Sequence, residues 1–498
     1  MRFPGFVGPS YVSQSPRAAD QRCMNWYVEN IEVADETFRS ALYPTPGVTS
    51  FVAETKSPVR GMIEQNGRCF AVIDDTLFEL FSDGTSLDIS AIGGNTTVDS
   101  ASAIPATFAA NVDAGDEIFV TSGEKGYILT LSTNNFVEVK DNASPTPQSL
   151  NVTQGEFLDG YFLGLDTDNS TLKISDLNDG TTWPTTQIAL RTAGGDKWQA
   201  IVVAHRDIWL FGQQTSEVWY NAGTSPFPFA PIPGAFLEEG VVAPFSAQRF
   251  GNTVVWLGKS EEGAGVVYLA NGYVPQRIST HAVEFAIQGY ARAGTSISDA
   301  VAFTYQEDGH VFYVLNFPTA KATWVYDGTT QLWHERGTWD SDAKLYKAWR
   351  PQYHAYAFDK HLVGDRELGT VYSMGIDKFT DAGGGPIRRL RRTPHLSVDD
   401  DWLFYHSFQV VLETGMGLTS PPAVQGDDPQ LMLRWSNNGG KTWGNEHWVS
   451  AGKTGEYGTR ALWRRLGRGY NRVFEVAVTD PVPWRVIGAY MDIAKGSP

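Results

Sequence analysis

Apolar and polar residues alternate along most of this 498-residue chain in short runs that end at Gly, Asp or Asn. Such runs are typical of β-strands joined by tight turns, whereas stretches with the 3.6-residue period of an amphipathic helix are hard to find. Many of the runs come in pairs, and each pair predicts a β-hairpin. The paired runs are 68–73 with 77–81, 117–120 with 127–131, 161–165 with 172–174, 207–212 with 217–220, 253–258 with 265–269, 310–315 with 322–327, and 354–358 with 369–373. The chain is therefore predicted to be all-β.

These hairpins recur at a nearly constant interval. Their first strands begin near residues 69, 117, 161, 207, 253, 310 and 354, so the gaps are 44 to 57 residues. A unit of about 40–50 residues that carries hairpins is typical of one blade of a β-propeller. Seven hairpins are visible, but a terminus can supply a strand that closes the ring, so both six and seven blades fit the pattern. Stacked sandwiches with accidental spacing are the alternative.

The remaining segments divide the chain into further parts. Residues 1–60 contain strand fragments interrupted by six prolines, which predicts an extended N-terminal arm. Residues 61–380 are the predicted propeller. Residues 381–392 begin with Asp-Ala-Gly-Gly-Gly-Pro and continue into an arginine run, which predicts a Gly/Arg-rich linker. Residues 393–498 are again rich in β-type runs and are predicted to form a C-terminal β-module.

Composition excludes several classes of protein. Hydrophobic residues make up 42% of the chain and charged residues 19%, which provides enough apolar material for a packed core. No apolar run reaches the roughly 18–20 residues that a membrane helix needs, and we expect no membrane span. The N-terminus lacks the pattern of a secretory signal. Cys23 and Cys69 cannot form a disulfide framework, which fits synthesis in a reducing cytoplasm.

The net charge of -17 is unevenly distributed. Residues 1–380 carry 25 Lys+Arg against 44 Asp+Glu, whereas residues 381–498 carry 14 against 12. An acidic body is a poor clamp for nucleic acid, because phosphate binding needs clustered cations. It suits a surface that DNA passes without sticking, although solubility alone also explains an acidic protein.

No catalytic motif is present in the sequence. There is no HExxH, CxxC, phosphate-binding loop or GxSxG sequence, so we expect no catalytic residues, no cofactor and no metal site. His310, His334 and His354 lie in or beside strands rich in aromatic residues. We interpret them as polar fillers of blade packing. The chain is predicted not to be an enzyme.

Two segments have the form of an Asp-box turn. Residues 436–443 place Ser436, Asn438, Gly440 and Trp443 in the pattern S-x-[DN]-x-G-x-x-W. In this hairpin turn the Ser and Asn side chains bond to the backbone, glycine takes a positive φ, and the tryptophan packs beneath. Residues 176–183 are a looser copy without the serine. These turns stabilise folds and are not catalytic, but they keep a sialidase-like or lectin-like propeller open as an alternative function.

Two segments concentrate positive charge. The first contains Arg388, Arg389, Arg391 and Arg392, and we expect it to contact a neighbouring subunit or a partner protein through bidentate hydrogen bonds. The second contains Arg460, Arg464, Arg465, Arg468 and Arg472. The alternative for both is ion pairing with nearby acids. These acids include Asp399, Asp400 and Asp401. Contact with phosphates is the other functional interpretation of both segments.

Over nearly its whole length the sequence resembles the packaged-DNA stabilisation proteins, or tail nozzle (tail hub) proteins, of short-tailed bacteriophages. Several matching segments in the same order carry this resemblance. They are residues 22–29, 174–183, 209–221, 309–313, 323–327, 333–336, 436–443, 463–467 and 479–481.

The resemblance implies a virion component without catalysis, made in the host cytoplasm. Members of the family attach below the portal and adaptor rings, typically as a hexamer. They extend the DNA exit channel, retain the packaged genome and let DNA pass without sequence recognition. A needle or plug closes the nozzle, and fibres or spikes attach around it. The competing functions are a glycan-active propeller and a receptor-binding tail module with exposed aromatic platforms.

Overall fold

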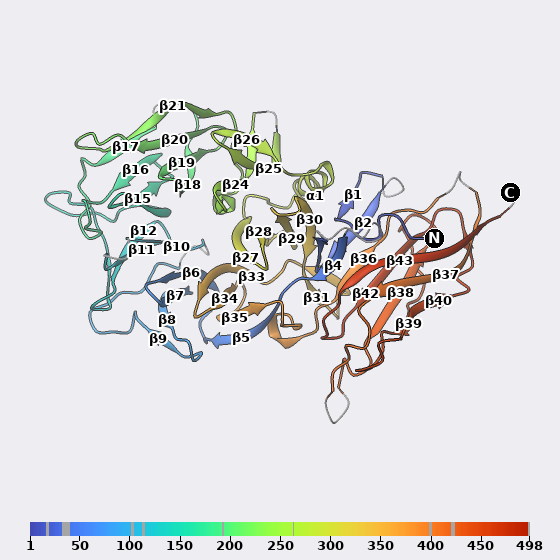
Figure 1. Ribbon diagram of the computed structural model, residues 1–498. Coiled ribbons are helices and arrows are strands. Elements are labelled where there is room, and N and C mark those ends of the chain that lie inside the picture. The colour runs from blue at the N-terminus through green and yellow to red at the C-terminus, as the bar shows by residue number, and fades with distance from the viewer. Residues whose placement is uncertain are drawn as a thin grey trace.

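The computed structural model describes residues 1–15, 19–31, 40–100, 104–111, 115–191, 194–261, 263–397, 401–419 and 424–496. These residues form a ring of β-sheets with a β-sandwich beside it, and both chain termini lie in the sandwich (Figure 1). The fold is all-β apart from one α-helix and two short 3-10 turns in the described residues. The propeller and the β-rich C-terminal module that the sequence predicts are both present.

Seven sheets follow one another around the ring in the described residues (Figure 1). The innermost strand of each sheet contacts the innermost strand of the next, and the last of them contacts the first, so the ring is closed. The first sheet contains β6 (Val59–Gln65), β7 (Arg68–Ile73), β8 (Thr76–Leu80) and β9 (Ser86–Asp88). The second contains β10 (Thr107–Ala110), β11 (Glu117–Ser122), β12 (Lys125–Thr130) and β13 (Asn135–Glu138). The third contains β14 (Gln154–Leu158), β15 (Tyr161–Asp166), β16 (Thr171–Ile174) and β17 (Ile188–Leu190).

The other four sheets complete the circle. The fourth sheet contains β18 (Trp198–Ala204), β19 (Asp207–Gly212), β20 (Ser216–Asn221) and β21 (Phe229–Leu237). The fifth contains β22 (Gly240–Val241), β23 (Gln248–Phe250), β24 (Thr253–Ser260), β25 (Gly263–Asn271) and β26 (Val274–Arg277), with the 3-10 turn η1 (Pro244–Ser246) before β23. The sixth contains β27 (Val301–Glu307), β28 (His310–Phe317), β29 (Ala322–Asp327) and β30 (Leu332–Arg336), and the seventh contains β33 (Pro351–Ala357), β34 (Lys360–Asp365), β35 (Thr370–Gly375) and β5 (Gly47–Ala53).

An apolar cluster fills each contact between neighbouring sheets. The central strands are continuous apolar runs that are buried on both faces, because every sheet packs between two others. Phe70 and Ile118 belong to the cluster between the first two sheets, for example, and Phe211 and Trp256 to the cluster between the fourth and the fifth. Burial on both faces explains why these strands read as apolar runs more than as strict alternation.

Six of the seven predicted hairpins are confirmed, because their two runs pair directly within one sheet. The seventh is wrong. The runs at 354–358 and 369–373 are separated by β34, which pairs with both β33 and β35. The structure also contains a helix that the sequence reading missed, α1 (His281–Arg292), which lies between the fifth and sixth sheets. This insertion accounts for the longest gap in the repeat.

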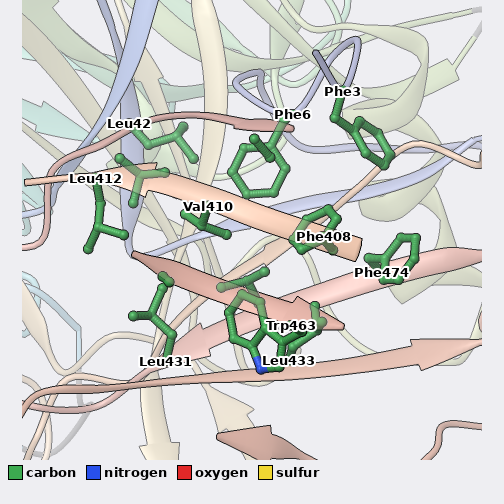
Figure 2. Close-up of a cluster of buried hydrophobic side chains, with 14 of the residues drawn as sticks. Phe3, Phe6, Leu42, Phe408, Val410, Leu412, Leu431, Leu433, Trp463 and Phe474 are labelled. Carbon is green, nitrogen blue, oxygen red and sulfur yellow. The ribbon is translucent and has the colours of Figure 1, made fainter. Parts of the chain in front are cut away.

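The sandwich packs two sheets against each other. One contains β2 (Asp20–Met24), with β1 (Tyr11–Val12) at its side, and β36 (Arg389–Arg392), β42 (Val473–Val478), β38 (Gln430–Ser436) and β39 (His447–Ser450). The other contains β3 (Trp26–Asn30), β4 (Ser40–Pro44), β43 (Val486–Lys495), β37 (Leu403–Leu412), β40 (Ala461–Arg464) and β41 (Arg468–Gly469). Figure 2 shows the apolar side chains between them, Phe408, Leu433 and Trp463 among them.

The N-terminal residues are not the extended arm that the prolines suggested. Phe3 and Phe6 are buried in the sandwich core beside Phe408 (Figure 2). β2, β3 and β4 belong to the two sheets of the sandwich, whereas β5 is the outer strand of the seventh propeller sheet. Proline marks extended chain but does not show what that chain pairs with. Here β1 pairs with β2 and β3 with β4, but β2, β4 and β5 also pair with strands hundreds of residues away.

The predicted linker is also mostly regular structure. Two of its glycines lie in the short 3-10 turn η2 (Ala382–Gly384), and three of its four arginines lie in β36. β2 pairs with β36 on one side and in parallel with β30 on the other, through Met24 and Glu335. One sheet therefore runs from the sixth propeller sheet into the sandwich, in the order β27-β28-β29-β30-β2-β36-β42-β38-β39.

Candidate functional site: the junction of propeller and sandwich

The four arginines predicted to meet another subunit lie inside the junction between propeller and sandwich. Arg389 and Arg391 are fully buried, and Arg388 is 9% exposed. Successive side chains of a strand point to opposite faces, so Arg389 and Arg391 share one face of β36 and Arg392 lies on the other. This placement overturns the predicted contact with another subunit, because the guanidinium groups bond within the chain.

Arg391 holds the N-terminal segment in place. Its guanidinium group donates to the carbonyl oxygens of Phe6 (2.6 Å), Gly5 (2.8 Å), Pro9 (3.1 Å) and Arg22 (3.2 Å), and to Gln21 Oε1 (3.0 Å). Burial lowers the pKa of Arg391 to about 10. A planar group with five N–H donors matches this set of converging carbonyls, and lysine could not make the same contacts.

Arg389 is buried with far fewer partners. Its Nη2 lies 3.5 Å from the Thr45 carbonyl, and its Nε and Nη1 have no hydrogen-bond partner in the structure. Burial lowers its pKa to about 9, although the Asp381 carboxyl opposes the shift, and the nearby Arg336 adds to it. Burial also raises the pKa of Asp381. Neighbouring arginines on one face of one strand are therefore solvated by the protein to very different degrees.

On the opposite face, Arg392 takes part in an ionic network around Glu475. Glu475 is 1% exposed and accepts hydrogen bonds from Arg392 Nη2 (3.0 Å) and from Arg434 Nε (2.6 Å). Arg392 Nη1 also donates to Asp20 Oδ2 at 2.8 Å. The network joins β2, β36, β38 and β42, so it fixes the N-terminal strand to the sandwich.

The Asp-box turn closes one side of this network. Ser436 Oγ accepts from the Gly440 N–H (2.9 Å), and Asn438 Oδ1 accepts from the Thr442 N–H (2.9 Å). Gly440 has φ +85°, and a Cβ there would lie 2.6 Å from Asp20 Oδ2. The predicted turn geometry is present, and glycine is required both by the backbone angle and by the approach of Asp20.

Trp443 does not pack on an apolar core as the turn pattern suggested. It is half-buried, with the guanidinium carbons of Arg392 and Arg434 at 4.8 and 5.0 Å from its ring centre. A cleft of about 740 Å³ lies here, lined by side chains that include Arg22, Arg388 and Arg392. Cation–π contacts replace the usual apolar packing because arginines occupy this face of the sheet.

A histidine links the second sandwich sheet to the propeller. His310 Nδ1 lies 2.8 Å from Asp327 Oδ2, and its Nε2 lies 2.7 Å from Glu29 Oε2 on β3. The hydrogen bond to Asp327 raises the pKa of His310 to about 9, so the imidazole is positively charged between two carboxylates at neutral pH. His334 is buried nearby, and burial lowers its pKa to about 3. His310 therefore clamps the chain segments, whereas His334 acts as a neutral filler.

The second predicted arginine group divides in two. Arg472 is buried, and it donates to the carbonyl oxygens of Leu466 (2.7 Å) and Arg468 (2.9 Å). The other four members, Arg460, Arg464, Arg465 and Arg468, are exposed. Of the acids considered as their partners, Asp401 pairs with Lys495 at 2.6 Å, and Asp399 and Asp400 lie outside the described residues.

The centre of the propeller is a second concave region. A cavity of about 620 Å³ is lined by one strand from each of the seven sheets. Burial raises the pKa of Glu156 there to about 7, and Arg249 Nη2, 3.8 Å from Glu156 Oε2, opposes the shift. Within the described ranges no group of three or more His, Cys, Asp or Glu side chains could hold a metal ion. No helix in those ranges has the length and apolarity to span a membrane.

The sequence found the arginines but missed the groups that bind them. Asp20 and Glu475, which bind Arg392, stand in unremarkable strand patterns far from residues 388–392 along the chain. An acidic residue or an arginine within an otherwise apolar strand sequence could have revealed these groups, because a buried charge needs a partner.

Two protein-family models match the chain. The model described as bacteriophage P22 Gp10, beta-propeller, matches residues 24–377, and the model described as bacteriophage P22 Gp10, beta-sandwich, matches residues 388–494. Together they cover both bodies of the fold in order. They agree with the propeller and with the β-module that the sequence predicts, and they identify that module as a sandwich.

Solved structures resemble the chain only remotely. PorZ of Porphyromonas gingivalis is 10% identical, with a TM-score of 0.37 over 81% of this chain and 46% of its own. The extracellular domain of BT4673 from B. thetaiotaomicron is 9% identical, with a TM-score of 0.44 over 91% of this chain and 62% of its own. This chain thus spans about half of the PorZ chain it matches. No curated protein matches it significantly in sequence.

Proposed function

The chain belongs to the bacteriophage P22 Gp10 family across both its propeller and its sandwich, and from this membership we propose that it forms the nozzle of a short phage tail. The ordered match of both bodies is the observation that carries the proposal. In this role the protein is a structural component of the virion, made in the host cytoplasm. Six copies form a ring below the portal and adaptor, extend the DNA exit channel and retain the packaged genome. A needle or plug, and fibres or spikes, attach to the same ring.

The continuous sheet between propeller and sandwich supports a mechanical role. A nozzle holds back packaged DNA, so its parts must resist relative movement. Domains of one chain commonly move against each other when their interface is small and polar. Here β2 hydrogen-bonds to strands of both bodies, and His310 and Arg391 tie the N-terminal segment to each of them. These links favour a rigid unit.

The charge of the chain supports passage of DNA without binding. The propeller and N-terminal residues up to 380 carry 44 Asp+Glu against 25 Lys+Arg. Phosphates gain no binding energy beside like charges, so DNA in transit would slide past this surface.

A glycan-active propeller is not favoured. The good Asp-box copy lies in the sandwich, outside the propeller, and its hydrogen bonds link turn residues to each other. Its tryptophan is covered by two arginines of the junction. The turn therefore has a structural explanation in this chain, and it nominates no pair of catalytic carboxylates.

Two measurements test the proposal. Native mass determination of the purified chain should give a species near six times the 54.8 kDa of one copy. Particles assembled without the protein should package DNA but lose it, so DNase should degrade their genome while leaving that of complete particles intact. A monomer combined with unchanged DNA retention would overturn the nozzle assignment.

A further inference from the structure

The end of the sandwich that is farthest from the propeller exposes a group of aromatic side chains. Trp402, Phe404 and Tyr470 are 38%, 42% and 39% exposed. Trp402 and Tyr470 are in edge contact with ring centres 5.5 Å apart, and Phe404 pairs across the strands with Arg468. Leu403 pairs with Lys495, so this surface lies beside the C-terminal end of β43, at the outer edge of the molecule (Figure 1).

Three arginines lie in or between β40 and β41, the strands that pair with β37 next to these aromatic residues. Arg464, Arg465 and Arg468 are all exposed, and the Arg468 guanidinium carbon lies 4.6 Å from the centre of the Trp402 ring. In the part of the chain that the structure describes, none of the three forms an ion pair, whereas Arg392 of the junction pairs with Asp20 and Glu475. We call Trp402, Phe404, Tyr470, Arg464, Arg465 and Arg468 the tip patch.

The composition of the tip patch is that of a protein-binding hot spot. Trp, Tyr and Arg are the residues most enriched among those that dominate binding energy, and they act best where a partner excludes water. Three exposed cations without carboxylate partners also favour a partner of negative potential. Both properties point to an acidic protein surface.

The propeller of another copy offers such a surface. In each sheet the turn from the innermost strand to the second, and the end of the third strand, lie on the same face of the ring, because successive strands are antiparallel. Exposed acids on this face include Asp83, Asp308, Asp359 and Asp377. Arg206, a cation of the same face, is neutralised by Asp159 at 2.6 Å.

We propose that the tip patch of one copy docks on this acidic propeller face of the next copy, which deepens the ring proposed above and rests on it. The two surfaces differ, so the contact is heterologous, and a heterologous contact that closes gives a ring. The patch and the propeller lie at opposite ends of the molecule (Figure 1), so one copy can contact two neighbours at the same time. DNA is the competing ligand for arginines beside aromatic rings, and the tests below discriminate against it.

Charge reversal tests the energetic role of the patch. The variant Arg464→Glu, Arg465→Glu, Arg468→Glu should weaken ring assembly on the order of 100-fold in native mass titrations, because hot-spot residues are lost and acid then faces acid. The control Lys321→Glu, Lys441→Glu, Lys453→Glu makes the same change in charge at exposed residues outside the patch. It should assemble within about threefold of the wild type. Circular dichroism melts of both variants should match the wild type.

Site-specific photocrosslinking tests the identity of the partner. Tyr470 is replaced by p-benzoylphenylalanine in rings formed by the full chain, and in a parallel sample with added single- and double-stranded DNA. We expect a crosslinked dimer on a denaturing gel, with the linked peptide containing Asp83, Asp308, Asp359 or Asp377. Replacement at Tyr220, which is 40% exposed on β20 outside the tip patch, should give no such dimer.

The outcomes separate this inference from the nozzle assignment. A wild-type ring that crosslinks elsewhere, or crosslinks to DNA, overturns the docking surface but leaves the ring standing. A charge-reversed variant that assembles like the wild type also overturns the docking surface and leaves the ring standing. A wild-type chain that never exceeds one copy overturns the ring, and the docking surface with it.

Discussion

The propeller and the junction are both built from β-sheets, but different forces hold them together. Apolar clusters fill the contacts between successive propeller sheets, and they use the continuous apolar strands that every sheet offers. The junction instead buries Arg389, Arg391 and Glu475. The hydrophobic association of apolar faces is non-directional, whereas a buried guanidinium group is stabilised only where hydrogen-bond acceptors surround it. The junction therefore fixes one arrangement of the two bodies, a task that apolar packing performs less strictly.

The junction also contains its own contrast. Arg391 has five acceptors within 3.2 Å, whereas Arg389 has one at 3.5 Å. A buried charge that is poorly solvated by the protein stabilises little or nothing. The two arginines should therefore respond to substitution in opposite ways.

The largest expected effect comes from the N-terminal residues. Phe3→Ala combined with Phe6→Ala removes two rings that are each 2% exposed, and each loss should lower the free energy of unfolding by about 3–5 kcal/mol. Urea titration followed by tryptophan fluorescence measures this. Phe236→Ala, at a position 46% exposed on β21, is the matched control and should cost less than about 0.5 kcal/mol. Equal midpoints for both variants would mean that the N-terminal segment is peripheral.

The two buried arginines provide the next comparison. Arg391→Met leaves several buried carbonyls without donors and should destabilise the chain by about 3 kcal/mol. Arg389→Met removes a poorly solvated charge and should leave stability unchanged or raise it by about 1 kcal/mol. Both values come from the same urea titrations. Equal losses would show that both guanidinium groups are solvated alike, and the contrast between them would be wrong.

The clamp at His310 should make stability depend on pH. Its pKa is about 9 in the folded chain and about 6.5 when unfolded, so the folded state binds the proton more tightly. The stabilisation is complete below pH 6.5 and is lost as the pH rises through 9. Glu29 and Asp327 face the imidazole, Tyr27 packs against it, and neutral His334 lies near.

We expect a difference of about 1–2 kcal/mol between pH 6 and pH 10 that His310→Gln abolishes, allowing for solvent screening at the partly exposed Glu29. Urea titrations of the two proteins across this range give the value. An identical pH dependence in the variant would assign the effect to other groups.

The smallest expected effect is at the Asp-box turn. Ser436→Ala removes the acceptor for the Gly440 N–H and should cost about 1 kcal/mol. Thr442→Ala, at an exposed position of the same turn, keeps that hydrogen bond and should cost less. Thermal melts resolve the difference. A larger loss in Thr442→Ala would place the stabilising bond at Asn438 instead of Ser436.

Much of the propeller could be predicted because its signals are local. The apolar run at 207–212 and the run at 217–220 are neighbours both in the chain and in the sheet, so the short turn between them predicts that they pair. The seventh sheet was predicted incorrectly for two reasons. The sequence pattern did not reveal β34 between the two runs, and the outer strand β5 comes from the N-terminal part of the chain.

The sequence by itself determined the all-β class, the repeat of the propeller sheets, the Asp-box turn and the uneven charge, since each depends on residues a few positions apart. Only the tertiary structure decided that strands β2 to β5 join both bodies and that Arg391 is buried while Arg464 is exposed. Arginines look alike in sequence whatever their surroundings. Their burial depends on carbonyls and carboxylates hundreds of residues away, and those groups meet them only when the chain has folded.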